Sequence, residues 1–302
     1  TAEYVLYTDM MSSLEKYLHY YFANDCVNSE WFVMDTPKVM ADVKPLIQSL
    51  AAEHTLVRPI FDEWKAQSKT VSNGKTLSAN SAHKALHATY LQQYERHKKA
   101  EAEMIIAGLE LKSMIGTNDG IENMVYLVTT ESIPFDSKAF LASLATKTDR
   151  DKCHKTETKI LPEAPKIAGE DPLSKIDPAL DTRLKALDKA YKANKPDSSN
   201  LAQPSLPVTT ALINLHGVYL TSKKEFKETE WALQKTTAEL VSMLKDNKEI
   251  QGIVVWERKQ DTKQKFEKEW AKKFFPTEYK AHEGTPVTKI HRVTIDDGKK
   301  YP

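Results

Sequence analysis

Three histidines on one stretch of the chain come closest to the spacing of a metal site. His83 and His87 are four residues apart, and His97 follows ten residues later. Side chains four residues apart on a helix lie on one face, so the first two could reach one ion. A zinc protease motif would place Glu directly after the first His, but Lys84 stands there, and no nearby carboxylate or Cys completes the ligand set. The sequence therefore favours solvated histidines on a helix face over a metal centre.

Two other fragments resemble parts of catalytic sites. Cys153 and His154 are adjacent, but adjacency alone does not let an imidazole activate a thiol, and the flanking residues are polar. The segment 72–76 contains Gly-Lys-Thr, but Lys69 occupies the position where a phosphate-binding loop has its first glycine. We therefore expect no catalytic residue, no cofactor and no metal, and we expect that the chain is not an enzyme.

Composition argues against nucleic acid and membrane spans. The 302 residues carry 43 basic and 42 acidic side chains, for a formal charge of +1, and Lys and Glu interleave along the charged stretches. Such interleaving is typical of solvated helix faces rather than of a nucleic-acid groove. The longest apolar runs are far shorter than the roughly 20 residues that cross a bilayer. Cys26 and Cys153 form no paired-cysteine motif, which fits a compartment where thiols stay reduced.

Helical patterns dominate the first half of the chain. From Ser78 to Ile115 there is no proline, and Gly108 is the single glycine, so we expect one long strut-like helix capped by Ser78 and ended by Gly116. Further helices are expected over 8–24, from an N-cap at Thr36 to about 69, and over 137–148, with Asp136 as the cap of the last. For residues 121–130 the pattern leaves helix and strand open.

The second half divides at a proline-rich region. Residues 151–207 contain many prolines and one clear helix over 177–194, so we expect a linker with an embedded helix. Helices are expected over 209–245 and 249–275, and residues 285–295 should form an extended strand without an obvious internal partner. The predicted fold is mostly α, with elongated long-helix hairpins, the proline-rich linker and an extended C-terminal tail. The expected domains are an N-terminal arm (1–150), the linker (151–207) and a C-terminal hairpin with its tail (208–302).

Narrow apolar stripes indicate contacts with partner helices. A stripe one or two residues wide suits one neighbouring helix better than a full core. The residues that we expect to bind partners lie on the last helix, on the linker helix and at one turn: Phe266, Trp270 and Phe274; Leu180, Leu184, Leu187 and Tyr191; Pro134 and Phe135.

A family resemblance accompanies these patterns. The segment Tyr94 to Lys99 (YERHKK) on the long helix, followed by Ile133 to Asp136 (IPFD) at the start of a short helix, resembles subunit d of the mitochondrial ATP synthase peripheral stalk. The resemblance extends over roughly residues 78–148. It implies a non-catalytic strut in the mitochondrial matrix, beside the proton-driven rotary motor and bundled with other stalk helices. The start at Thr1 instead of Met fits a removed leader.

Three hypotheses follow from the sequence. The leading one is a structural subunit of a large assembly, such as a peripheral-stalk subunit, that binds other protein subunits without nucleic acid or a membrane span of its own. The second is a capsid or scaffold protein, whose linkers and strand tails clasp neighbouring copies. The third is an enzyme that uses Cys153 with His154, or His83 with His87.

Overall fold

Two long helices form the centre of the fold. The computed structural model describes residues 18–19, 21–22, 26–28, 31–32, 34–122, 124–126, 128–194 and 204–291. Within them, α4 (Ser81–Ile115) and α9 (Thr210–Leu244) each have 35 residues and lie side by side. At about 1.5 Å per residue, each is roughly 52 Å long. The described part of the chain is mostly helical, which confirms the predicted fold class.

The ends of α4 are set by local hydrogen bonds. Asn80 Oδ1 accepts a hydrogen bond from the backbone N–H of His83 (2.9 Å), and His83 Nδ1 accepts one from the N–H of Asn80 (3.3 Å). This reciprocal pair is a capping box in which His replaces the usual Glu or Gln. The cap is therefore Asn80, two residues after Ser78, the predicted cap. Gly116 ends it as predicted, with a φ of 57° that favours glycine.

Small residues let α4 and α9 approach each other closely. Ala100 and Ala107 of α4 are buried, and a Cβ added at Gly108 would lie 3.3 Å from the ring of Tyr219 on α9. On either side of this region the two helices contribute to two separate hydrophobic cores. The core near the start of α4 contains Tyr90, Ile167, Leu240, Val241, Leu244, Ile250, Ile253, Val254 and Trp256, and the core near its end contains Leu111, Ile115, Ile121, Val125 and Leu212.

Shorter helices cover this pair. Helix α3 (Lys44–Gln67) packs on α9, where Phe61 stacks on Trp231 with ring centroids 5.6 Å apart. Helix α8 (Pro178–Ala193), which is capped by Asp177 and lies within the helix predicted over 177–194, packs on α4. Before α3 come β1 (Cys26–Asn28), β2 (Trp31–Phe32), α2 (Thr36–Lys38) and a π-helical turn η2 (Val39–Val43). Asp35 accepts the hydrogen bond of the Lys38 N–H, which is the capping role predicted for Thr36. Most of the helix predicted over 8–24 lies outside the described residues.

The proline-rich region runs back across α4. After β7 (His154–Leu161) it forms β8 (Lys166–Ile167). This strand joins β3 (Thr76–Leu77), β9 (Glu249–Ile250) and β10 (Val254–Val255) in a sheet of order β3-β9-β10-β8. Gly169 follows with a φ of 83°, and an added Cβ there would lie 3.3 Å from Leu91. Tyr90 donates a hydrogen bond to Glu170. Helix α7 (Leu173–Ile176) then leads into α8.

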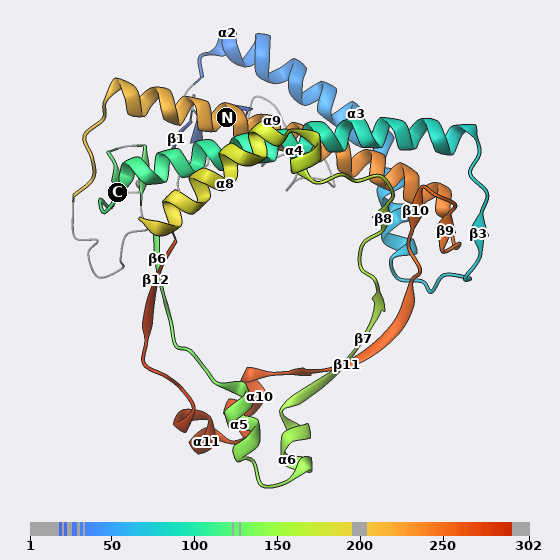
Figure 1. Cartoon of the computed structure of the whole chain (residues 1–302), viewed down its shortest axis with the longest axis vertical. Coiled ribbons are helices and arrows are strands. Elements are labelled where there is room, and N and C mark those ends of the chain that lie inside the picture. Colours follow the sequence, from blue (N-terminus) through green and yellow to red (C-terminus); the bar gives the residue numbers. More distant parts are fainter. Residues whose placement is uncertain are drawn as a thin grey trace.

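Two thin ribbons connect this helical layer to a small cluster of helices (Figure 1). One ribbon pairs β7 (His154–Leu161) with β11 (Lys259–Phe266), and the other pairs β6 (Val128–Ser132) with β12 (Val287–His291). A short hairpin of β4 (Gly120–Ile121) and β5 (Val125–Tyr126) lies near the end of α4. The cluster, here called the tip, contains α5 (Ser137–Ser143), α6 (Lys147–Lys152), α10 (Lys268–Phe274) and α11 (Pro276–Ala281). It has its own core of Phe140, Leu144, Cys153, Ala271 and Tyr279.

The strands correct two predictions and settle a third. The helix expected over 249–275 is wrong, because its first part forms β9, β10 and β11 and only its end, α10, is helical. The extended segment expected over 285–295 does have an internal partner, because β12 pairs with β6. Residues 121–130, for which helix and strand were both open, contribute to β4, β5 and β6 where the structure describes them.

A buried arginine joins the ends of α3 and α9. The side chain of Arg258 is fully buried, with its guanidinium 4.5 Å from the ring centroid of Trp256. It donates hydrogen bonds to Gln67 Oε1 of α3 (3.1 Å) and to the carbonyl of Lys245 (2.8 Å), the residue that follows the last turn of α9. A cation at this position also interacts favourably with the negative end of the helix dipole.

Replacing Arg258 by Ala should destabilise the fold. The change leaves the buried Gln67 side chain and the Lys245 carbonyl without the hydrogen bonds of Arg258 and opens a cavity beside Trp256, at a cost of roughly 3–5 kcal/mol. Urea unfolding followed by tryptophan fluorescence measures the loss. The control Arg183→Ala removes an exposed pair with Glu110 (2.7 Å) and should cost about 0.5 kcal/mol. A loss for Arg258→Ala no greater than that of the control would contradict this role.

Candidate functional site

The three histidines of α4 are used within the fold and do not form a metal site. His83 belongs to the capping box, and His87 Nε2 donates to the carbonyl of Ala168 (2.8 Å). His97 Nδ1 lies 3.2 Å from Thr229 Oγ1 on α9. All three are half-buried, so the prediction of solvated histidines is wrong in that respect. No group of three or more metal-binding side chains occurs in the described ranges.

Cys153 and His154 do not form a nucleophile and base. The Cys153 side chain is fully buried in the core of the tip, and burial raises the pKa of its thiol. Its Sγ lies 3.6 Å from the carbonyl of Asp149. His154 donates from Nδ1 to the carbonyl of Arg150 (2.7 Å). Because the thiolate is the reactive species, a buried thiol with a raised pKa is a poor nucleophile.

The Gly-Lys-Thr fragment forms a turn. Asn73 Oδ1 accepts a hydrogen bond from the N–H of Lys75 (2.8 Å), and Gly74 has a φ of 75°. The chain then enters the two-residue strand β3, whereas a phosphate-binding loop would lead into a helix. This part of the chain lacks the geometry of a nucleotide site.

The predicted partner-binding residues at the tip divide into two groups. Phe135 and Phe266 belong to the tip core, where Phe135 stacks on Tyr279 (4.3 Å between ring centroids) and on Phe266 (6.0 Å). Pro134 is exposed, and its carbonyl accepts a hydrogen bond from the N–H of Gly284. Trp270 and Phe274, by contrast, lie on α10 with 40% and 48% of their surface exposed. These two side chains are therefore available to another molecule.

The predicted partner-binding residues of α8 lie on a helix that packs within the chain. Leu180, Leu184, Leu187 and Tyr191 are all half-buried, and α8 rests on α4. An ion pair between Arg183 and Glu110 (2.7 Å) links the same two helices. The predicted contact of these residues with another protein stays a prediction.

The β7/β11 ribbon has one charged face. Directly paired residues in an antiparallel ribbon share a face, and successive residues alternate between faces. The register therefore places every charged residue of the two strands on the same side, apart from His154. These residues, called the lysine face below, are Lys155, Glu157, Lys159, Lys259, Asp261, Lys263 and Lys265, and Leu161 accompanies them.

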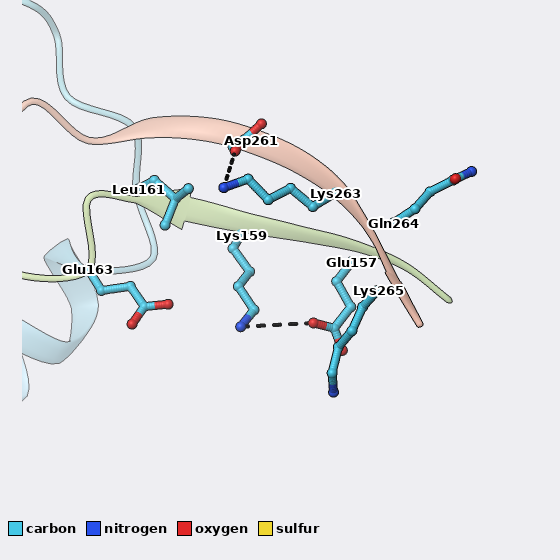
Figure 2. A pocket seen from close by; sticks show the side chains of 8 residues that line it. All are labelled: Glu157, Lys159, Leu161, Glu163, Asp261, Lys263, Gln264 and Lys265. Atoms are coloured by element: carbon cyan, nitrogen blue, oxygen red, sulfur yellow. Dashed lines mark ion pairs between the residues drawn. The ribbon is translucent and has the colours of Figure 1, made fainter. Parts of the chain in front are cut away.

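A shallow hollow lies along this ribbon (Figure 2). Its volume is about 310 Å³, and its lining includes Lys159, Lys263 and Lys265 together with Glu157 and Asp261. Lys159 pairs with Glu157 (3.8 Å) and Lys263 with Asp261 (3.3 Å). The hollow therefore holds charged groups of both signs.

Sequence reasoning missed the lysine face because it assigned residues 249–275 to a helix. The signal was present: charged residues recur every second position at Lys259, Asp261, Lys263 and Lys265, which is the period of a strand. The aromatic residues at the end of this segment have helical spacing, and the prediction extended that helix over the whole of 249–275.

Comparisons with known proteins supply no family assignment. No protein-family model, no curated protein and no solved structure matches the chain. Within the described residues, no helix is both long enough and apolar enough to cross a membrane.

Three histidines lie at the contacts of α9. His54 of α3 approaches the ring of Trp231 (5.0 Å between centroids), His97 of α4 stacks on Phe226 (4.9 Å), and Nε2 of His216 on α9 itself is buried without a hydrogen-bond partner. Burial lowers the pKa of each imidazole. The carboxylates Glu101 and Glu230 raise the pKa of His97, but burial has the larger effect. Glu53 likewise raises the pKa of His54 by less than burial lowers it.

Acid should therefore destabilise the packing of α9. A pKa that is lowered in the folded state means that the unfolded chain binds more protons once the pH falls below 6.5, the ordinary histidine value. With respect to these histidines, the free energy of unfolding should be level between about pH 7 and pH 8 and should fall between about pH 6.5 and pH 5. Urea midpoints across this range measure the effect, and His216→Leu should reduce the slope. Equal midpoints at both ends of the range would contradict the buried, neutral imidazoles.

Cys153 should resist alkylation in the folded chain. Because its thiol is buried and its pKa is raised, iodoacetamide at about pH 7.5 should modify it at least tenfold more slowly than in urea-unfolded chain. Peptide mass spectrometry separates Cys153 from Cys26. Fast modification of Cys153 in the folded chain would restore the hypothesis of a catalytic cysteine.

Proposed function

We propose that this chain is a non-catalytic structural subunit of a large protein assembly. The main support is the division of the described chain into three separate small cores, of which the tip core is connected to the others by two two-stranded ribbons. An isolated two-stranded ribbon is marginally stable in water. Ribbons of this kind gain stability when another surface covers them.

The exposed aromatic pair on α10 supports the same proposal. Trp270 and Phe274 are large, lie four residues apart on one helix and remain substantially exposed. Tryptophan and other aromatic side chains contribute much of the binding energy at protein interfaces. In contrast, the candidate catalytic residues are buried or bound to backbone groups. A structural subunit that contacts its partners through the tip accounts for the exposed aromatic pair and for the buried or hydrogen-bonded candidate catalytic residues.

The narrower form of the proposal is a peripheral-stalk subunit similar to subunit d of the mitochondrial ATP synthase, on the matrix side of the inner membrane. The residues 94–99 and 133–136 support it through their resemblance to that family. The long pair α4 and α9 has the form that a stalk component needs. Its partners would be other stalk helices.

The test is to isolate the full-length chain from its source cells under native conditions. Native mass spectrometry and crosslinking should show it bound to several different proteins, and those of a rotary ATP synthase would support the narrower form. Crosslinks mainly between copies of the chain would favour the capsid or scaffold hypothesis instead. A free monomer in the cell would contradict the proposal.

The double variant Trp270→Ala/Phe274→Ala should weaken incorporation into the assembly. Truncating two interface aromatics that act as anchors should cost about 2 kcal/mol or more of binding, and so lower the incorporated fraction at limiting expression. The urea midpoint of the free chain should change little, because both side chains are exposed. Leu56→Ala, at an exposed apolar residue of α3, is the control. Equal incorporation of the double variant and the control would exclude α10 as a contact point.

A further inference from the structure

The β7/β11 ribbon has two open edges. Its strands pair with each other over eight residue pairs, and within the described chain neither has a second partner strand. By contrast, β9 and β10 each have strands on both sides. An open edge presents unpaired backbone N–H and C=O groups and can accept a further strand.

The lysines of this ribbon are only weakly satisfied by carboxylates of the chain. Lys259, Lys263 and Lys265 have 61–70% of their side-chain surface exposed and lie 3.3 Å from a Glu or Asp two residues away. Exposed pairs of this kind contribute at most about 1 kcal/mol. Their ammonium groups therefore remain available to carboxylates of another molecule.

One pair in the ribbon places like charges opposite each other, each with a single carboxylate nearby: Glu157 lies 3.9 Å from Lys155, and Glu267 lies 3.3 Å from Lys265. Lys155 and Lys265 are directly opposite each other on the lysine face. Like charges at directly opposed positions destabilise a ribbon. A carboxylate placed beside Lys265 would relieve this repulsion.

We propose that an extended acidic segment of another subunit adds to the open edge of β11 as a third strand. This inference rests on the proposed function and specifies one of the partners. Backbone hydrogen bonds would join the segment to β11, and carboxylates at alternate positions would face Lys263 and Lys265. Side chains directly opposite in adjacent strands have Cβ atoms about 4.5–5.5 Å apart, within reach of an ion pair.

The charges favour β11 over β7 as the receiving edge. On the lysine face, β11 has two successive lysines, Lys263 and Lys265, with Glu267 beyond them, whereas on β7 Glu157 separates Lys155 from Lys159. Lys263 and Lys265 both line the hollow on the ribbon, so their side chains border open space (Figure 2). The competing explanation is that the lysines only protect an exposed edge against aggregation.

Zero-length crosslinking of the native assembly tests the proposal. A carbodiimide joins a lysine amine directly to a carboxylate that contacts it. In the assembly that contains the full-length chain, Lys263 and Lys265 should crosslink to Asp or Glu residues two positions apart in one segment of another subunit. Crosslinks of these lysines only to carboxylates of the chain itself would overturn the proposal.

Charge reversal provides a second readout. Lys263→Glu/Lys265→Glu should reduce the fraction of the chain in the assembly at least tenfold at limiting expression. Lys185→Glu/Lys192→Glu changes the charge equally at exposed positions of α8 and should have little effect. Circular dichroism of both free variants checks that they fold, and the crosslinks of the unmodified chain do not depend on either variant.

The outcomes separate this inference from the proposed function. If the chain is found in a large assembly but the reversal leaves its incorporation unchanged, the acidic strand is excluded and the structural role stands. Aggregation of the reversed chain, with incorporation of its soluble fraction unchanged, would favour edge protection. If the chain is a free monomer in the cell, both proposals fail.

Discussion

The packing of α4 against α9 is the contact on which the other elements depend. Ala100, Ala107 and Gly108 bring the two helices close together, and the two larger cores form on either side of this contact. Helix α3 then packs on α9 and α8 on α4. Arg258 joins the ends of α3 and α9 to the segment that leads into β11. The position of the β7/β11 ribbon therefore depends on the helix pair.

The ribbons and the tip are stabilised by much less buried apolar surface than the helix pair. The tip has a core of five buried residues, and each ribbon has only two strands. Little apolar surface is buried along the β7/β11 ribbon, where most side chains are polar and exposed. Such parts lie at the low end of local stability in a protein. They are also the parts that carry Trp270, Phe274 and the lysine face, so the surfaces proposed to bind partners coincide with the regions that need them.

The long elements could be predicted from the sequence because their signals are local. Asp177 with Pro178, Thr209 and Gly116 mark the boundaries of α8, α9 and α4, and each prediction agrees with the structure to within two residues at that boundary. The strands were harder, because their pairing joins residues far apart in the chain. β12 needs β6 and β11 needs β7, and neither partner is visible from composition or periodicity alone. The alternation of charged residues over 259–265 could be read from the sequence, but only the register shows that Lys155, Glu157 and Lys159 of β7 share the same face. The buried state of Cys153 likewise depends on α10, which follows it by more than a hundred residues.

Hydrogen exchange, compared between the free chain and the native assembly, tests the central claim most directly. In the free chain, amides of β7 and β11 should exchange at least a hundredfold faster than those in the middle of α4 and α9, because about 3 kcal/mol or more separates local opening of a two-stranded ribbon from global unfolding. In the assembly, the ribbon amides should become protected. The contrary result is that, in the free chain, the ribbon amides exchange as slowly as those of α4 and gain no further protection in the assembly. That result would contradict the claim that partner subunits stabilise the ribbons.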